Sequence, residues 1–596
     1  MPFSRMISFR HTLLLLLVSC CAVLAPYLFL YRELGQAPKL PAGAFNIADY
    51  YYGRTEEVKD GHPFLGNPYF FEHRDDMPPA FFLADWFAAA PLLLGMSTMD
   101  TALVDFFLWS FLFLVLAYLL FRVFDVSLNV SLAGSVVVFL SVYMHMIRPV
   151  SMQEIYPFFL VFLIAFVLWL KEPSDNKKTC FVALSAAMTA YIYTYAWQIV
   201  FVVFLLTPAT FWFGGRREHM KAFLRMFGVF VLASVPLLIF TWKQVHNPFY
   251  FETLQRIGLV ETHIPASAVV TSCIWIPAMF LLWYILSLGN SAVNLKKRTG
   301  TIFLFFVLTG LAMVAVTLSN IITGKDLELP QHVERFTIIW LVFASIYSLY
   351  FFSKHKPTHP LPSQHLFFGI LLVALLFCGN VHYLLIYGPP DAFAAIDPDR
   401  ERKVQEFAKP LAWLDEHVKE QSVIWADPNA ILNSYITIMT KHYVLFSAGG
   451  ELHLVSNKEV EDRYLVARYF ALTEADLEDD YWAYGGVGNA VHQWKTHNRE
   501  VAVCNMLHLD RFGRPCGVMT DRVSWKGKSY FADLYARFEE EIRPNIVAEL
   551  AKYHVSYIMR DSETDRPEFL PQEIPGTTLV YSDGRFFIYS FTPPSE

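Results

Sequence analysis

The chain contains 596 residues, of which 55% are apolar and 17% are charged, and its formal net charge is −7. Soluble domains average about 25% charged residues, so this composition is typical of a membrane protein and argues against an ordinary soluble one. The negative charge is modest and dispersed, which predicts no nucleic-acid partner.

The first predicted membrane span covers residues 12–30. This apolar run is long enough to cross about 30 Å of hydrocarbon. Arg5 and Arg10 precede it, and basic residues before a first span favour a cytoplasmic N-terminus. A cleaved signal peptide is the weaker interpretation, because the run is long and no clear Ala-x-Ala site follows it. We therefore expect an uncleaved helix.

A polar, acidic and aromatic segment at residues 46–79 follows this helix. A chain this apolar has little reason to hold Asp, Glu, His and Arg side chains at a membrane edge unless chemistry takes place there. We predict that Asp49 is the leading carboxylate of a reaction centre, with Tyr50 beside it as a substrate-binding residue. The alternative is an ordinary solvated loop acid, which is the better interpretation of Glu56 and Glu57.

The first outer loop is expected to cover residues 32–103 and to contain a short apolar segment, 80–94, that carries Asp85. Such a segment is typical of an interfacial or half-buried helix. About ten full spans follow it, which makes about eleven in all. We expect them at 104–121, 129–147, 155–170, 180–196, 198–213, 222–241, 268–288, 301–322, 336–352 and 366–387.

Lys and Arg residues gather in every second connection between the spans, as the positive-inside rule requires. The remaining short connections are nearly free of them. This pattern predicts an integral protein of the cytoplasmic membrane, with the first loop and the C-terminal region on the outer face. The basic residues expected in the cytoplasm are Arg122, Lys171, Lys177, Lys178, Arg216, Arg217, Lys221, Arg225, Lys296, Lys297, Arg298, Lys354 and Lys356.

Two domains are therefore predicted, a transmembrane domain at 1–387 and a periplasmic or otherwise extracytoplasmic α/β domain at 388–596. About 200 residues suffice for an independent core. Alternating and β-branched runs mark its strands, and a Ser-Asp-Gly turn marks a final hairpin. The expected elements are a helix at 413–418 and strands at 422–425, 443–446, 555–559, 578–581 and 586–589.

Cys504 and Cys516 lie in this outer domain, whereas the other five cysteines lie in apolar segments. Oxidising conditions outside the cytoplasm would permit a disulfide between these two. Their spacing alone does not fix the geometry, so a bonded pair and two free thiols are both open.

The plan of the whole chain resembles that of GT-C-type membrane glycosyltransferases, which include protein O-mannosyltransferases, lipid A aminoarabinose transferases and oligosaccharyltransferases. The matching features are one inside-to-outside helix, a long first outer loop with an early acid (Asp49 in IADYYYG), about ten more spans and an outer α/β domain. The resemblance implies inverting transfer of a sugar from a polyprenyl-phosphate donor to a lipid, glycan or protein acceptor. The segment 480–486 resembles an oligosaccharyltransferase motif, Trp-Trp-Asp-Tyr-Gly, but Ala483 replaces its Asp.

Inverting transfer needs a carboxylate to orient or deprotonate the acceptor. Asp49 is the candidate base, and Glu154, Asp75 and Asp76 are candidate supporting acids. His73 together with Asp76 is also a candidate site for a divalent metal, on which some members of the class depend. The alternatives are a charged loop braced by its own ion pairs for residues 72–76 and a helix cap paired with Arg148 for Glu154.

Positive charge is also needed to stabilise the departing phosphate. Arg148, Arg335 and Arg74 are the candidates, because a guanidinium group matches the geometry of a phosphate. Snorkelling at the start of a helix is the alternative for Arg335, and His332 beside it fits a structural role.

Two rival classes are a transporter or flippase of a lipid-linked glycan and a non-catalytic scaffold with an outer domain. Transporters usually have broken helices and repeat symmetry at the membrane midplane, whereas here the polar residues gather at one face. A non-catalytic scaffold would not explain why the first outer loop is rich in acidic residues.

Overall fold

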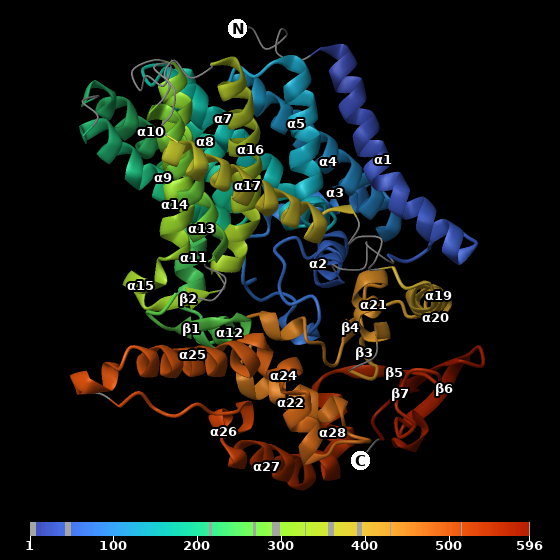
Figure 1. Cartoon of the computed structure of the whole chain (residues 1–596). Coiled ribbons are helices and arrows are strands. Elements are labelled where there is room, and N and C mark those ends of the chain that lie inside the picture. Colours follow the sequence, from blue (N-terminus) through green and yellow to red (C-terminus); the bar gives the residue numbers. More distant parts are fainter. Residues whose placement is uncertain are drawn as a thin grey trace.

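The computed structural model has two parts, a bundle of long helices and a smaller C-terminal domain beneath it (Figure 1). The start of the first helix and the last strand lie at opposite ends of the molecule. The structure describes residues 8–41, 49–213, 217–265, 270–288, 298–327, 329–355, 363–389, 396–428, 431–513 and 515–594.

Seven helices within the described residues are long and apolar enough to cross a membrane. They confirm an integral membrane protein in outline, while its orientation stays a prediction. Their long apolar runs are closed by caps; for example, the Ser97 side chain accepts from the backbone N–H of Asp100. The seven are α1 (Phe9–Leu34), α4 (Thr98–Val123), α7 (Met152–Lys171), α9 (Thr194–Phe213), α14 (Arg298–Thr317), α16 (Leu329–Lys354) and α17 (Ser363–Ile386).

Further helices occupy other predicted spans. Two of them, α10 and α11, meet at 54° and count as one span at most, which gives up to eight qualifying helices among the described residues. The count of about eleven therefore stays a prediction. These helices are α5 (Leu128–Ser141), α8 (Asn176–Ile192), α10 (Met220–Ala233), α11 (Val235–Val245) and α13 (Val270–Leu288).

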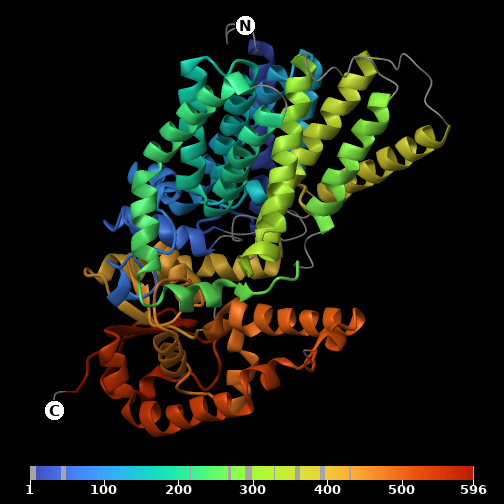
Figure 2. The same cartoon turned by 90° about the vertical axis from the view of Figure 1, so that its left-hand side faces the viewer.

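Short elements lie at the lower end of the bundle, towards the C-terminal domain (Figure 2). Strands β1 and β2 pair antiparallel beneath the bundle. The segment predicted as an interfacial helix at 80–94 is confirmed as a short helix, α3. These elements are α2 (Asp49–Lys59), α3 (Leu83–Leu93), α6 (Tyr143–Met146), α12 (Tyr250–Ile257), β1 (Leu259–Glu261), α15 (Asn320–Thr323) and β2 (Lys325–Leu327).

The C-terminal domain is built on a five-stranded mixed sheet of order β4-β3-β5-β7-β6. Strand β3, which lies between β4 and β5, is a fully buried Val-Ile-Trp run that pairs in parallel with both neighbours. Continuous apolar runs are typical of parallel strands that are buried on both faces. The predicted strands and the final hairpin are confirmed, and Gly584 in the hairpin turn has φ +99°. The strands are β3 (Val423–Trp425), β4 (Tyr443–Val444), β5 (Val555–Asp561), β6 (Thr577–Ser582) and β7 (Phe586–Phe591).

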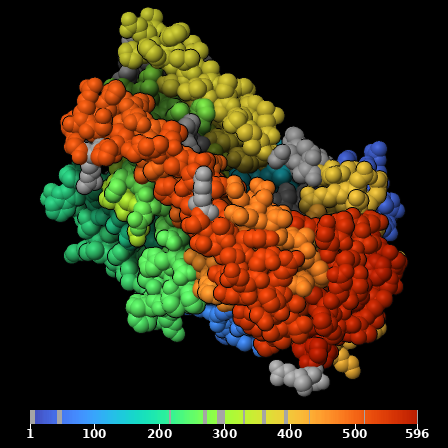
Figure 3. Space-filling view, turned by 90° about the horizontal axis from the view of Figure 1, so that it is seen from below, coloured from blue at the N-terminus to red at the C-terminus, as the bar shows by residue number. Residues whose placement is uncertain are grey.

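The C-terminal domain, coloured orange to red, covers much of the lower face of the molecule, and part of the first outer segment (blue) lies at its edge (Figure 3). Cys504 at the end of α25 forms a disulfide with Cys516, so the open question of their pairing is settled in favour of a bond. The helices are α19 (Pro398–Glu406), α20 (Ala408–His417), α21 (Ile431–Met439), α22 (Asn457–Ala467), α23 (Glu474–Asp479), α24 (Tyr481–Val487), α25 (Gln493–Met506), α26 (Arg522–Lys526), α27 (Lys528–Arg537) and α28 (Ile546–Lys552).

The core of this domain includes residues from the first outer segment. Leu40, Tyr69 and Phe70 are 1%, 3% and 0% exposed and belong to the same apolar cluster as the sheet. The Tyr69 carbonyl accepts from the backbone N–H of Val444 at 3.0 Å, which covers the edge strand β4. A side chain at Gly450 would come within 2.5 Å of the Phe70 ring, so glycine is required there. The two predicted domains therefore share a core.

Candidate functional site

Helix α2 lies at the junction of the bundle and the C-terminal domain and packs against α3 and α21. Its first residue is Asp49, whose side chain lies outside the described part of the structure. The prediction that Glu56 and Glu57 are solvated is wrong, because they are only 2% and 6% exposed. Glu56 accepts from Thr98 and Lys59, each at 2.8 Å, and the Tyr443 hydroxyl donates to Glu57 at 3.3 Å.

Burial raises the pKa of Glu57 to about 8, from an ordinary value near 4.5. Between these two values the folded chain holds a proton that the unfolded chain releases, so stability falls as the pH rises through this window. Glu57→Gln cannot ionise and should therefore be more stable than the wild type at pH 8.5, by up to a few kcal/mol, at about 1.4 kcal/mol per pKa unit. The advantage should shrink towards pH 5.

Thermal unfolding of both proteins at the two pH values checks this expectation. Glu56→Gln is the matched control, because it weakens the contacts of Glu56 with Thr98 and Lys59 and should destabilise the chain at both values. An advantage of Glu57→Gln that grows towards acid pH would contradict a buried, proton-holding Glu57.

Four ionisable side chains gather where α2 meets α3, α4 and α7, and we call them the acid cluster: Arg54, Asp85, Asp105 and Glu154. Arg54 donates to Asp85 at 2.7 Å, with side-chain exposures of 8% and 0%. Glu154, on the first turn of α7, interacts electrostatically with the other three and is 0% exposed. Burial by itself would lower the pKa of Arg54, but the interaction with the Asp85 side chain is stronger, and the pKa of Arg54 is raised overall. The cluster is thus buried and electrostatically coupled.

Several polar atoms of this cluster have no hydrogen-bond partner. They are both oxygens of Glu154, one oxygen of Asp85 and Nε of Arg54. Glu154 does interact with the backbone of Val150, but no hydrogen bond of standard geometry results. Unsatisfied buried polar atoms are rare and often mark sites that bind or react.

The turn that leads to Glu154 is strained. Val150 has φ +57°, which is unusual for a β-branched residue. Strained residues of this kind cluster at functional sites. The turn joins Arg148 to the start of α7, so the strained backbone fixes Arg148 and Glu154 relative to each other.

A second group, the arginine cluster, consists of Arg148, Arg335, Tyr51, Tyr193 and His145. Arg148 donates to the Tyr51 hydroxyl at 3.4 Å, and Arg335 donates to the Tyr193 hydroxyl at 3.3 Å. His145 and Tyr193 each interact electrostatically with both guanidinium groups. Arg148 and Arg335, predicted from distant segments, are therefore brought together.

The two clusters meet at α2. Tyr50 lies 5.3 Å from Tyr51, ring centre to ring centre, and Arg54 stacks over Tyr50 at 5.6 Å. Arg148 in turn lies 5.4 Å from the Tyr51 ring. Consecutive residues of α2 thus face the acid cluster on one side and the arginine cluster on the other, which places buried carboxylates beside half-buried guanidinium groups.

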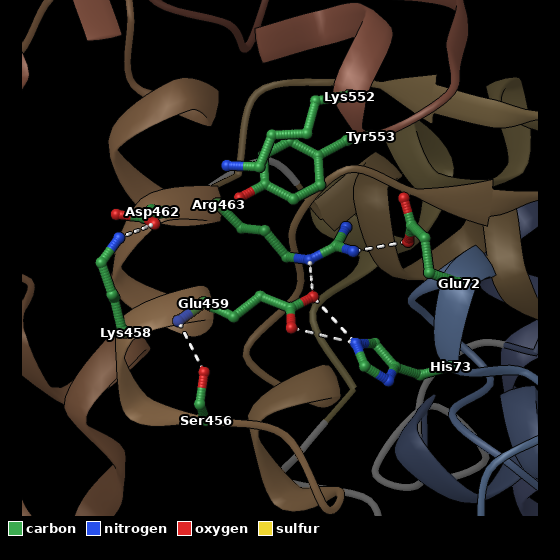
Figure 4. Close-up of a pocket in the computed structure, with 9 residues that line it drawn as sticks. All are labelled: Glu72, His73, Ser456, Lys458, Glu459, Asp462, Arg463, Lys552 and Tyr553. Atoms are coloured by element: carbon green, nitrogen blue, oxygen red, sulfur yellow. Dashed lines mark hydrogen bonds and ion pairs between the residues drawn. The ribbon is translucent and has the colours of Figure 1, made fainter. Parts of the chain in front are cut away.

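The predicted cluster at residues 72–76 lies elsewhere, at a pocket of about 360 Å³ between the first outer segment and α22 (Figure 4). His73 contacts Asp76 at 2.6 Å and Glu459 at 2.9 Å. Arg463 pairs with Glu459 at 3.0 Å and also with Glu72. These charges satisfy one another, as the alternative of a loop braced by ion pairs describes, and they bind the segment to the outer domain.

Arg74 and Asp75 also have local partners. Arg74 donates to the Phe71 carbonyl at 2.9 Å, and Asp75 lies 3.4 Å from His62 and 3.6 Å from Arg74. Within the described residues no three His, Cys, Asp or Glu side chains are placed to hold a metal together. The side chains of His73 and Asp76, predicted as a metal site, pair with each other and with Glu459 instead.

Sequence reasoning did not assign several of these residues. Asp105 lies seven positions into α4, and an ionisable residue inside an apolar span is itself a signal of function. Asp85 was noted without a role. Arg54, Tyr51 and Tyr193 carry no local signal, because only the packing of α2 and α16 gives them their partners.

No protein-family model matches this sequence, and neither does any curated protein. Similar solved structures include those of the archaeal oligosaccharyltransferase AglB from Archaeoglobus fulgidus, which has the GT-C fold that the sequence resembles. The apo form is 11% identical over 98% of this chain and 74% of its own, with a TM-score of 0.40. The complex with an inhibitory peptide and a dolichol-phosphate is 10% identical over 96% and 74%, with a TM-score of 0.39. The form tethered to an acceptor peptide containing the NVT sequon is 11% identical over the same shares, with a TM-score of 0.41.

Proposed function

We propose that this chain is an inverting glycosyltransferase that moves a sugar from a polyprenyl-phosphate donor to an acceptor at the outer face of the membrane. The observation that carries the proposal is the meeting of Arg148 and Arg335 around His145 and Tyr193. The acid cluster with the buried Glu154 adjoins this group through Tyr50 and Tyr51 of α2. Paired guanidinium groups suit a phosphate, and a carboxylate beside them suits the incoming nucleophile.

The arginine cluster takes the phosphate of the donor in this proposal. As the bond from the sugar to the phosphate oxygen breaks, negative charge grows on that oxygen, and Arg148 and Arg335 stabilise it. Tyr51 and Tyr193 accept hydrogen bonds from these guanidinium groups and hold them in place. The lipid tail of the donor lies among the apolar helices.

The acid cluster, together with Asp49 and Tyr50, orients the acceptor, which is a lipid, a glycan or a protein. Asp49 accepts the proton of the acceptor as it attacks from the face opposite the phosphate, and Glu154 and Tyr50 position it. Asp75, Asp76 and Arg74 act in docking the first outer segment rather than in the chemical step, given their partners. The bond between Cys504 and Cys516 supports the outer location of this side, because disulfides persist in oxidising compartments.

Asp49→Asn tests the proposal directly. The amide keeps the shape of the side chain but cannot take up a proton, so transfer from a polyprenyl-phosphate sugar in proteoliposomes should fall to background. The abundance of the protein in the membrane should stay unchanged. A transporter or a scaffold would tolerate the change, so full activity of Asp49→Asn would refute the assigned base.

A further inference from the structure

The acid cluster already contains a cation that belongs to the chain. The Arg54 guanidinium lies 2.7 Å from Asp85 and interacts electrostatically with Glu154. Arg54 comes from α2, Asp85 from α3 and Glu154 from α7, so three separate elements place one positive charge among buried acids. Carboxylates gathered in this way are otherwise the hard oxygen ligands of a divalent metal.

The position of Arg54 is fixed by more than one contact. Its Nη1 lies 3.5 Å from the Tyr50 hydroxyl, its guanidinium carbon lies 5.6 Å from the centre of the Tyr50 ring, and Nη2 donates to Asp85. Only 8% of the Arg54 side chain is exposed, so the guanidinium group is largely desolvated. A charge held so firmly is available at every turnover without binding from solution.

We propose that Arg54 is the resident cation of the acid cluster and takes the place that a divalent metal would otherwise fill between α2, α3 and α7. The inference deepens the proposed function, since it names what holds the acceptor-side carboxylates in order. A metal that coordinated Asp85 and Glu154 would lie next to the guanidinium and be repelled by it. The described acids alone also form no three-ligand group.

The cluster holds three carboxyl groups and one guanidinium, so it offers oxygen ligands to a dissolved cation as well. Arg54 prevails because it is tethered: its effective concentration at the cluster far exceeds that of a free ion at ordinary concentrations. Removal of the tether should therefore expose a site for the free ion. This expectation separates a resident cation from an arginine that only braces α2.

The experiment measures thermal unfolding of the full chain in nanodiscs, after treatment with EDTA and during titration with MnCl₂. The wild type should show no shift in its unfolding temperature and no bound Mn²⁺ by metal analysis. Arg54→Met should unfold at a lower temperature and recover part of the loss with Mn²⁺, which it should now bind. Arg54→Lys keeps the charge and should stay unresponsive.

Arg74→Met is the matched control, because Arg74 lies in the same outer segment but its partners are Phe71 and Asp75. It should show no response to Mn²⁺. The proposal is overturned if the wild type holds a stoichiometric divalent ion that Glu154→Gln removes, or if folded Arg54→Met ignores Mn²⁺. Should Arg54→Met fail to fold, the measurement on the wild type still decides. None of these readouts depends on sugar transfer, so failure of the proposed function would be seen separately.

Discussion

Replacement of Arg335 by glutamine should lower the rate of sugar transfer by about 100-fold or more, the usual cost of losing one group that stabilises developing negative charge. Arg335 and Arg148 meet around Tyr193 and His145, where a departing phosphate would need both. Arg335→Lys should recover part of the rate, because a lysine supplies the charge but not the planar fork. The initial rate in proteoliposomes measures these effects.

The loss should also appear in donor binding. Farnesyl phosphate is a soluble probe of the phosphate site, and it should raise the unfolding temperature of the wild type more than that of Arg335→Gln or Arg148→Gln. Arg217→Gln is the control, since Arg217 stacks on Trp212 at the predicted cytoplasmic end of the bundle. Equal losses in Arg335→Gln and Arg217→Gln, or none in either, would rule out the arginine cluster as the phosphate site.

Replacement of Arg256 by methionine should destabilise the docking of the outer domain by about 3–5 kcal/mol, as is usual when one partner is removed from a buried charged network. Arg256 is 0% exposed and donates to the carbonyls of Glu451, His453 and Val455 at 2.9, 3.1 and 2.8 Å. It joins α12 to residues 451–455, where the His453 ring lies 6.1 Å from the ring of Tyr50 on α2.

Hydrogen exchange of residues 447–457 in the full chain would report this loss, and proteolysis of the same segment should become faster. Arg499→Met serves as the control, because Arg499 is only half-buried and donates at 3.3 Å to the Ile264 carbonyl of the neighbouring connection. Wild-type protection in Arg256→Met would mean that the docking does not depend on this residue.

Much of the fold follows from local patterns. Apolar runs predict the spans, and the fully buried run at β3 and the Ser-Asp-Gly turn before β7 predict the sheet, because burial and turn geometry act over a few residues. The solvated interpretation of Glu57 is wrong for the opposite reason. Its environment is set by Tyr443, which is 386 residues away, and no local signal reports such a neighbour.

Part of the candidate site could also be predicted from the sequence. Arg148, Glu154 and Arg335 stand out because charged residues at the ends of apolar spans are costly. The charged residues at 72–76 are predicted as a site from their density in the sequence. In the structure they pair with Glu459 and Arg463 of α22, which the sequence does not indicate. The coupling of Asp85 to Glu154 depends on how α3 and α7 pack, which periodicity does not encode.

The shared core has a consequence for how the molecule is made. Leu40, Tyr69 and Phe70 leave the ribosome early, but the sheet on which they pack is synthesised last. Until the C-terminal domain exists, α2 lacks its contacts with α21, and the apolar side chains of Leu40, Tyr69 and Phe70 lack the core on which they pack. Maturation of the reaction centre is thereby coupled to completion of the polypeptide, and a fragment that starts at residue 388 lacks part of its own interior.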